Sequence, residues 1–174
     1  MVSIPNSEVS TISRFHLAQV NIGRLLAPID SPPLADFVAN LEAINRLAEQ
    51  TPGFVWRLQS DAGDATAFSM FDEFTIPNLT VWTDVQSLHA YVYKSAHIDV
   101  MKRRKEWFAP MKVAFMALWW IPAGHIPSLA EAEQKLLLLR EQGPTPDAFT
   151  FRQHFPAPDD VKRADWSLDG HCPA

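Results

Sequence analysis

The stretch WTDVQSLHAYVYKSAHIDVMKRRKEWFAPMKVAFMALWWIPAGHIP, residues 82–127, decides the fold of this chain. It holds three of the six histidines, four of the six tryptophans and the basic run 102–105. If residues 84–111 form one helix, at about 100° per residue, one stripe combines apolar and polar side chains. The stripe consists of His89, Tyr93, His97, Val100, Arg104, Trp107 and Phe108. Its polar groups either complete a core by bonding to nearby carbonyls and carboxylates or line a binding cavity, and both interpretations stay open.

A strand is predicted at residues 112–121, ended by Pro122. Its two faces are both apolar, with Val113, Phe115, Ala117, Trp119 and Ile121 on one side and Ala114, Met116, Leu118 and Trp120 on the other. A strand with one face in water alternates apolar with polar residues. This strand therefore needs cover on both faces.

The rest of the core follows from hydrophobic periodicity. Strands are expected at residues 14–22, 54–59 and 78–83, and an amphipathic helix from Leu34 to about Thr51. The order strand, helix, strand, strand, helix, strand indicates an α+β fold, the ferredoxin-like split βαβ arrangement with an antiparallel sheet and both helices on one face. The other face can be buried against a copy of itself, which predicts a homodimer, a dimeric α/β barrel with one cavity per subunit between sheet and helices.

Two more elements are predicted after the core. Ser128 and Glu131 have the spacing of a capping box, which starts a third helix at 129–141. Alternating apolar residues then predict a fifth strand at 149–155. The fold therefore carries an extra C-terminal helix and strand.

Residues 60–74 form a long insertion between two predicted strands. Loops of this length are uncommon without a functional role, so we expect it to be a lid over the cavity. The domain is predicted to cover residues 14–157, with loosely ordered extensions at residues 1–13 and 158–174.

The composition of the 174-residue chain limits the classes of protein to which it can belong. Hydrophobic residues make up 47% and charged residues 20%, as in ordinary globular domains. The net charge of −5 argues against a nucleic-acid partner, because tracking phosphates needs a surplus of basic residues. The single cysteine, Cys172, excludes an internal disulfide framework and a cysteine-cluster zinc site. Since no apolar run approaches about 18 residues and no signal segment opens the chain, we expect a cytoplasmic protein without a membrane partner.

Three runs resemble the motifs of a bacterial family, the domain of unknown function 3291. They are SAHIDVMKRRKEWF at 95–108, LWWIPAGHIPSLAEA at 118–132 and GPTPDAFTFRQHFPAP at 143–158. That family resembles, more distantly, the antibiotic-biosynthesis monooxygenase superfamily of dimeric α/β barrels. The superfamily includes cofactor-free oxygenases of polyketide-like phenols, haem-degrading enzymes and isomerases of small cyclic compounds. The resemblance implies a fold and a kind of pocket without fixing a reaction.

General acid–base chemistry fits the polar stripe best. A histidine titrates near neutral pH, so His97 could remove a proton while Arg104 stabilises the enolate or phenolate that forms. Tyr93 could donate to the same oxygen. An alternative for Arg104 is an ion pair with Glu106 or another carboxylate. His125, in the tight loop AGHIP, is a further catalytic candidate or else a cap for the next helix.

We expect further side chains around these groups to form the walls of the ligand-binding cavity. The substrate-binding candidates are His89, Met101, Trp107, Phe108, Trp119, Trp120 and Trp82. No metal is expected, since His89 and His97 would lie about 12 Å apart along a helix and no compact metal motif occurs. Nucleotide-binding motifs and a GxSxG elbow are absent. No cofactor is expected, although a haem held by His97 or His125 beside a tryptophan stays open.

These features predict a small-molecule enzyme of secondary metabolism that acts on an apolar aromatic or polyketide-like compound by histidine-assisted proton transfer. A cofactor-independent monooxygenase, an isomerase and a cyclase all fit this description. Two alternatives use the same cavity. One is a noncatalytic carrier or sensor, and the other is a haem-binding or haem-degrading protein.

Overall fold

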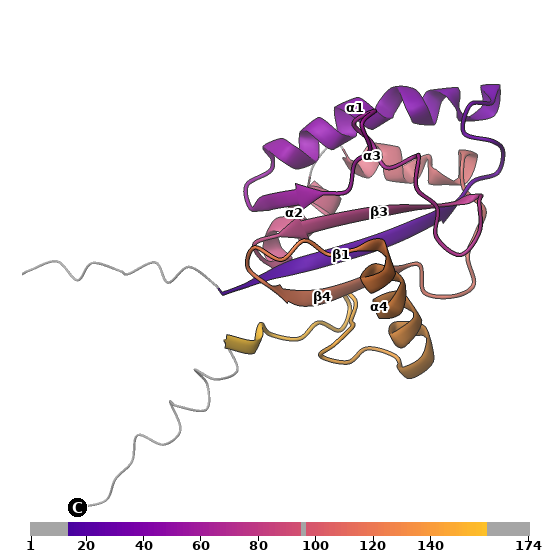
Figure 1. Cartoon of the computed structure of the whole chain (residues 1–174). Coiled ribbons are helices and arrows are strands. Elements are labelled where there is room, and N and C mark those ends of the chain that lie inside the picture. The colour runs from indigo at the N-terminus through magenta and orange to yellow at the C-terminus, as the bar shows by residue number, and fades with distance from the viewer. Residues whose placement is uncertain (1–13, 95–96, 160–174) are drawn as a thin grey trace, which may run out of the picture.

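A sheet lies between two helical layers in the computed structural model, which describes residues 14–94 and 97–159 and, for His97, the backbone alone (Figure 1). The strands are β1 (Phe15–Arg24), β2 (Phe54–Arg57), β3 (Thr75–Trp82) and β4 (Met116–Pro122). The helices are α1 (Ala35–Gln50), α2 (Val85–Lys94), α3 (His97–Lys102) and α4 (Leu129–Gln142). Helices α1, α2 and α3 lie on one side of the sheet, and α4 lies on the other.

The four strands follow the order β2-β3-β1-β4, and every neighbouring pair is antiparallel. The predicted α+β fold with a ferredoxin-like antiparallel sheet is therefore confirmed. Within the central pair, Gln19 lies opposite Thr80 and Asn21 lies opposite Asn78. Because side chains alternate along a strand, these four residues share the sheet face that looks toward α1 and α2.

Helix α1 ends where the sequence supplies breakers. The hydroxyl of Thr51 donates to the Leu47 carbonyl at 2.7 Å, and Pro52 follows. Gly53 then adopts a φ of 87°, and a Cβ at this position would lie 2.1 Å from the side-chain oxygen of Ser87. Only glycine therefore fits where the chain turns from α1 into β2.

The single helix predicted at residues 84–111 is wrong. Helix α2 starts as expected after Asp84, whose carboxylate accepts from the Ser87 amide at 2.7 Å. After α3, however, the amide of Trp107 donates to the Arg104 carbonyl in a tight 3₁₀ turn. The chain then bonds to the end of β1, where Leu26 donates to the Trp107 carbonyl at 2.9 Å. Pairing with β1 and burial of Trp107 outweigh the helical periodicity here.

The predicted fifth strand at 149–155 is also wrong. Phe149 alone pairs with β4, exchanging two backbone hydrogen bonds of 2.8 Å with Leu118. The residues beyond it bend away, and the indole of Trp120 donates to the Phe155 carbonyl at 2.8 Å. The alternating phenylalanines therefore pack against one face of the sheet as a bent segment. They do not extend the sheet by another strand.

Helix α4 supplies the cover that β4 needs on its second face. The sheet residues of this face are Ala18, Val20, Ile22, Leu79, Val81, Ala117, Trp119 and Ile121. They pack against Ala132, Leu136 and Leu139 of α4, and no member of the sheet set is more than 2% exposed. A homodimer stays a prediction, which sedimentation can test, but the face that motivated it is already buried by the chain itself.

The predicted start of α4 is confirmed, since the Glu131 amide donates to Oγ of Ser128 at 3.1 Å. Gly143 ends the helix with a φ of 73°. Of the predicted extensions, residues 1–13 and 160–174 lie outside the described residues. In residues 14–94 and 97–159, no helix is long and apolar enough to cross a bilayer.

Candidate functional site

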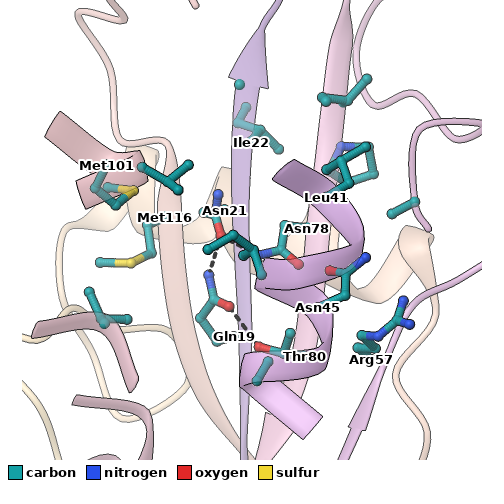
Figure 2. A pocket seen from close by; sticks show the side chains of 18 of the residues that line it. Gln19, Asn21, Ile22, Leu41, Asn45, Arg57, Asn78, Thr80, Met101 and Met116 are labelled. Atoms are coloured by element: carbon teal, nitrogen blue, oxygen red, sulfur yellow. Dashed lines mark hydrogen bonds between the residues drawn. The ribbon is translucent and has the colours of Figure 1, made fainter. Parts of the chain in front are cut away.

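A cavity of about 200 Å³ lies between the sheet and the helices α1, α2 and α3 (Figure 2). Its apolar walls include Phe37, Leu41, Ile44, Ile76, Leu88 and Val100. The lining comes from three helices and from all four strands of the sheet, so the cavity is part of the core architecture. Apolar walls with a few polar groups are typical of small-molecule sites.

Three of the predicted wall residues line this cavity, namely Met101, Trp107 and Phe108. Trp107 is only 2% exposed and packs against Phe37 of α1, with ring centroids 5.7 Å apart. Phe108 meets the same ring edge-on at 5.1 Å. The turn after α3, which breaks the predicted long helix, is thus what places these two aromatic rings in the cavity wall.

The other predicted tryptophans lie elsewhere. Trp119 is on the α4 face, where its indole donates to Glu131 at 2.8 Å. Trp120 belongs to the cluster around Phe149, next to the cavity but not in its lining. Trp82 is fully buried behind the lining and stacks on Tyr91 with centroids 5.2 Å apart.

Arg104 lines the cavity as a cation without an acidic partner among the described residues. One guanidinium nitrogen donates to the Ile22 carbonyl at 3.3 Å, and the group lies 4.3 Å above the ring of Phe115. Glu106, its predicted alternative partner, pairs with Arg103 at 2.8 Å instead. Desolvation lowers the pKa of Arg104, yet a guanidinium stays charged in proteins. A half-buried cation without a counter-charge favours binding of an anion.

Two tyrosines of α2 have opposite environments. Tyr93, the predicted proton donor, is 48% exposed and contacts His89 on the outer surface, with ring centroids 4.6 Å apart. Tyr91 lines the cavity and is 6% exposed. Burial raises the pKa of the Tyr91 phenol, and the positive charge of Arg57 opposes this shift only in part. Tyr91 therefore keeps its proton at neutral pH, and its hydroxyl donates to the Ile44 carbonyl at 3.4 Å.

None of the histidine side chains that the structure describes lines the cavity. His89 lies outside, between the rings of Tyr93 and Phe151. His97 is the first residue of α3, and its side chain lies outside the described part of the chain. Its backbone precedes Val100 and Met101, both in the lining, by one helical turn. The prediction that His97 is the base therefore stays a prediction.

His125 lies at the start of α4, away from the cavity. Its Nε2 is 2.7 Å from a carboxylate oxygen of Glu131, whose other oxygen accepts from the Trp119 indole at 2.8 Å. Burial alone would raise the pKa of Glu131, but these hydrogen bonds and the charges of His125 and Lys135 hold it below its ordinary value. The imidazole thus binds the side chain that fastens α4 to the sheet. The catalytic role of His125 stays a prediction.

Sequence reasoning missed a row of polar residues on the cavity face of the sheet. Figure 2 shows Gln19, Asn21, Asn78 and Thr80 together in the pocket, with Asn45 of α1 nearby. A signal for this row existed in the sequence. The middle of β1 and of β3 is mostly apolar, yet each carries two polar residues at alternate positions, and such residues share a face.

The loop between β2 and β3 closes one side of the cavity through Asp64, Ala65 and Thr66. Asp64 accepts from the Thr66 amide at 2.8 Å, and Arg57 donates to the Gly63 carbonyl at 2.8 Å. The loop therefore lies where a lid was expected, and its mobility stays a prediction. Over residues 14–94 and 97–159, no group of three or more potential ligands is placed to hold a metal ion.

The sequence was compared with known families and proteins. The family described as "Domain of unknown function (DUF3291)" matches residues 16–165. No curated protein sequence matches the chain significantly.

Solved structures give weaker matches. A protein of unknown function from Nitrosomonas europaea, NE2512, is 15% identical, with 66% of this chain and 97% of that chain covered and a TM-score of 0.42. A variant of SnoaB, a cofactor-independent oxygenase from Streptomyces nogalater, is 13% identical, with 64% and 95% covered and a TM-score of 0.40. A protein from Chloroflexus aurantiacus, described as a candidate antibiotic biosynthesis monooxygenase, is 14% identical, with 66% and 98% covered and a TM-score of 0.38. Likeness at this level concerns the arrangement of the chain and not its reaction.

Proposed function

The chain belongs to the DUF3291 family, and on this premise we propose that it is an enzyme acting on a small apolar compound, aromatic or polyketide-like. The proposed chemistry is removal of a proton from the substrate and stabilisation of the resulting enolate or phenolate. The observation that carries the proposal is Arg104, a half-buried cation that lines an apolar cavity without an acidic partner among the described residues.

Arg104 is suited to an oxyanion for electrostatic reasons. Its guanidinium lies over the rings of Phe115 and Phe108, at 4.3 Å and 5.9 Å from their centroids, and bonds to one backbone carbonyl. Surrounding apolar atoms lower the local dielectric constant, which strengthens attraction to a negative oxygen. A donor fixed in advance lowers the energy of a charge that develops only during the reaction.

His97 is the proposed base. It begins α3, whose residues Val100 and Met101 line the cavity one turn later. An imidazole can accept a proton at neutral pH, whereas the titratable groups described in the lining are arginines, Tyr91 and Asp64. Asp64 is engaged, since its carboxylate accepts two hydrogen bonds from Thr66.

One intermediate connects the three reaction types that the sequence allows. An enolate or phenolate can react with oxygen, can be reprotonated at another atom, or can attack a carbonyl within the same molecule. These outcomes correspond to a cofactor-independent monooxygenase, an isomerase and a cyclase. The proposal therefore concerns the first chemical step, which all three share.

Proton abstraction can be tested without the natural substrate. We suggest deoxybenzoin, an aromatic ketone with an acidic methylene group, incubated with the protein in D2O. Proton NMR then follows the loss of the methylene signal. Arg104→Met should slow the exchange by about 10²–10³-fold, because an oxyanion donor is lost. Lys105→Met, which removes the neighbouring exposed charge, is the matched control and should exchange like the wild type.

A noncatalytic carrier is the second candidate. It is favoured by the absence of a histidine among the described lining side chains. Exchange by the wild type at the rate of buffer alone, together with saturable binding of the ketone, would decide for the carrier.

A further inference from the structure

Five polar side chains on the cavity face of β1 and β3 form one connected hydrogen-bond network. The indole of Trp82 donates to the Thr80 oxygen at 2.9 Å, and the Thr80 hydroxyl donates to Oε1 of Gln19 at 2.8 Å. Nε2 of Gln19 donates to Oδ1 of Asn21 at 2.8 Å, and Nδ2 of Asn78 donates to the same oxygen at 3.1 Å. Figure 2 shows the two links made by Gln19 as dashed lines.

Trp82 fixes which group donates and which accepts in each hydrogen bond of this network. An indole nitrogen can only donate, so the Thr80 oxygen must accept from it and has one proton to give. Gln19 must accept that proton with its carbonyl oxygen, which leaves its amide nitrogen to donate onward. Gln19 and Thr80 are each 4% exposed, so water does not replace these partners. The orientation of the amides therefore follows from chemistry, although amide oxygen and nitrogen have similar shapes.

Asn21 is the point where the network meets the cavity. Its carbonyl oxygen accepts from Gln19 and from Asn78, which uses both lone pairs. Its Nδ2, with two N–H donors, has no partner among the described residues. Asn21 lines the cavity (Figure 2). The group that Asn21 offers to a ligand is therefore a donor and not an acceptor.

Arg104 reaches the adjacent position of β1, where it donates to the Ile22 carbonyl at 3.3 Å. We propose that Asn21 is a specificity-determining residue that donates, beside Arg104, to an anionic oxygen of the ligand. The site then favours the deprotonated form of an enol or phenol, because Asn21 and Arg104 present only donors to that oxygen. This inference rests on the proposed function in one respect, that the same cavity holds the reacting oxygen.

The probe for this proposal is para-nitrophenol, a flat phenol that ionises near neutral pH and absorbs visible light as the phenolate. Its ionisation state in the complex is read from the absorbance, independently of turnover. At a pH where free para-nitrophenol is mostly protonated, added wild-type protein should raise the phenolate absorbance. We expect the phenolate to bind more tightly than the phenol by about 10-fold or more, equivalent to about 1.4 kcal/mol.

Two substitutions separate the donor from the network that orients it. Asn21→Asp keeps the oxygen that Gln19 and Asn78 need but replaces the free donors with a negative oxygen, so the phenolate preference should fall by about 10-fold or more. Thr80→Val breaks the link to Trp82 and should lower the preference about 3-fold, because the amides can then turn over. Thr80→Ser keeps the hydroxyl and should restore the preference. Thermal melting of each variant shows whether it is folded.

The proposal is overturned if the folded Asn21→Asp and Thr80→Val variants keep the wild-type preference. It is also overturned if wild-type protein binds both forms equally or binds neither at millimolar para-nitrophenol. A preference that Arg104→Met abolishes but Asn21→Asp leaves intact refutes the role of Asn21 and leaves the proposed function standing. Conversely, a preference that depends on Asn21 in a protein without proton exchange supports this inference and refutes the proposed function.

Discussion

The two faces of the sheet differ in the partners of their side chains. On the α4 face, residues such as Val20, Val81 and Trp119 are at most 1% exposed and belong to the apolar cluster that includes α4. On the cavity face, Asn21 keeps free donors and Arg104 has no acidic partner among the described residues. Unsatisfied polar groups cost free energy in a folded protein. The α4 face also has one such group, Nδ1 of His16, but in the part of the chain that the structure describes only on the cavity face do an amide with free donors and a cation without an acidic partner border the same cavity, which suits them to a ligand.

This difference predicts two kinds of mutational effect. Substitutions on the α4 face should change the free energy of unfolding and leave the chemistry of each folded molecule unchanged. Substitutions on the cavity face should change binding or turnover with little effect on stability. The comparison fails if both faces respond alike.

The largest expected effect is that of His97→Ala. If His97 is the base, the rate of deuterium exchange into deoxybenzoin should fall by about 10²–10⁴-fold, as for other general bases. On that hypothesis the melting temperature should stay near that of the wild type, because truncating a cavity-lining side chain removes few core contacts. The control is Lys102→Ala in the same helix. The ammonium nitrogen of Lys102 lies 3.0 Å from a carboxylate oxygen of Asp99, which is an exposed surface residue. A lower melting temperature with a normal exchange rate would assign His97 to the core instead.

The α4 face is tested by Leu136→Ala. Leu136 is fully buried between α4 and the sheet, so its truncation should lower the free energy of unfolding by about 2–5 kcal/mol. Leu137→Ala is the matched control, since Leu137 is 46% exposed and should change stability by less than about 0.5 kcal/mol. Urea denaturation measures both values. A loss of proton exchange in the folded Leu136→Ala protein would contradict the separation of the two faces.

The hydrogen-bonded carboxylate of Glu131 should make the free energy of unfolding depend on pH. The folded-state pKa of Glu131 lies below its ordinary value of 4.5, so its contribution is present above that pH and is lost as the pH falls through the lowered folded value. Glu131→Gln should cost about 1–3 kcal/mol near neutral pH, because two hydrogen bonds to a charged group are weakened. The variant should also lose less stability on acidification than the wild type. Glu133→Gln, at a nearby position of α4, controls for the change in net charge.

The smallest effect concerns the loop beside the cavity. Amides near Asp64 and Thr66 should exchange with solvent faster than those of β3, because the loop is held mainly by local hydrogen bonds. Binding of para-nitrophenol should slow this exchange, which mass spectrometry of deuterium uptake can follow. Uniform protection of the loop and β3 in the free protein would argue against a lid.

The fold was largely predictable because its signals are local. Alternation and helical spacing gave the order of strands and helices, and Ser128 correctly marked the start of α4. The two largest errors arose where distant contacts override periodicity. A smaller one is the strand predicted at residues 112–121, which starts only at Met116. Pairing of the segment around Trp107 with the end of β1 stops the predicted long helix, and a bend after Phe149 stops the predicted strand. Neither contact can be inferred from the spacing of neighbouring residues.

The site was less predictable for the same reason. Arg104 was singled out because it shares a helical stripe with apolar residues, and it does line the cavity. Tyr93 was singled out because it belongs to the same stripe, yet it lies on the outer surface, and Tyr91 lines the cavity instead. Asn21 was missed since its significance depends on partners in a second strand. Periodicity identifies the face of an element, whereas the satisfaction of a polar group depends on residues far away in sequence.

The position of α4 determines how the stability of the fold depends on protein concentration. A sheet whose second face is buried by another subunit loses that burial on dilution, so its melting temperature depends on protein concentration. Here the cover is covalently attached through the short connection that contains His125. Its effective concentration is therefore set by the length of that connection and not by the amount of protein present. The stability that α4 contributes should be the same in a nanomolar assay as in a concentrated stock.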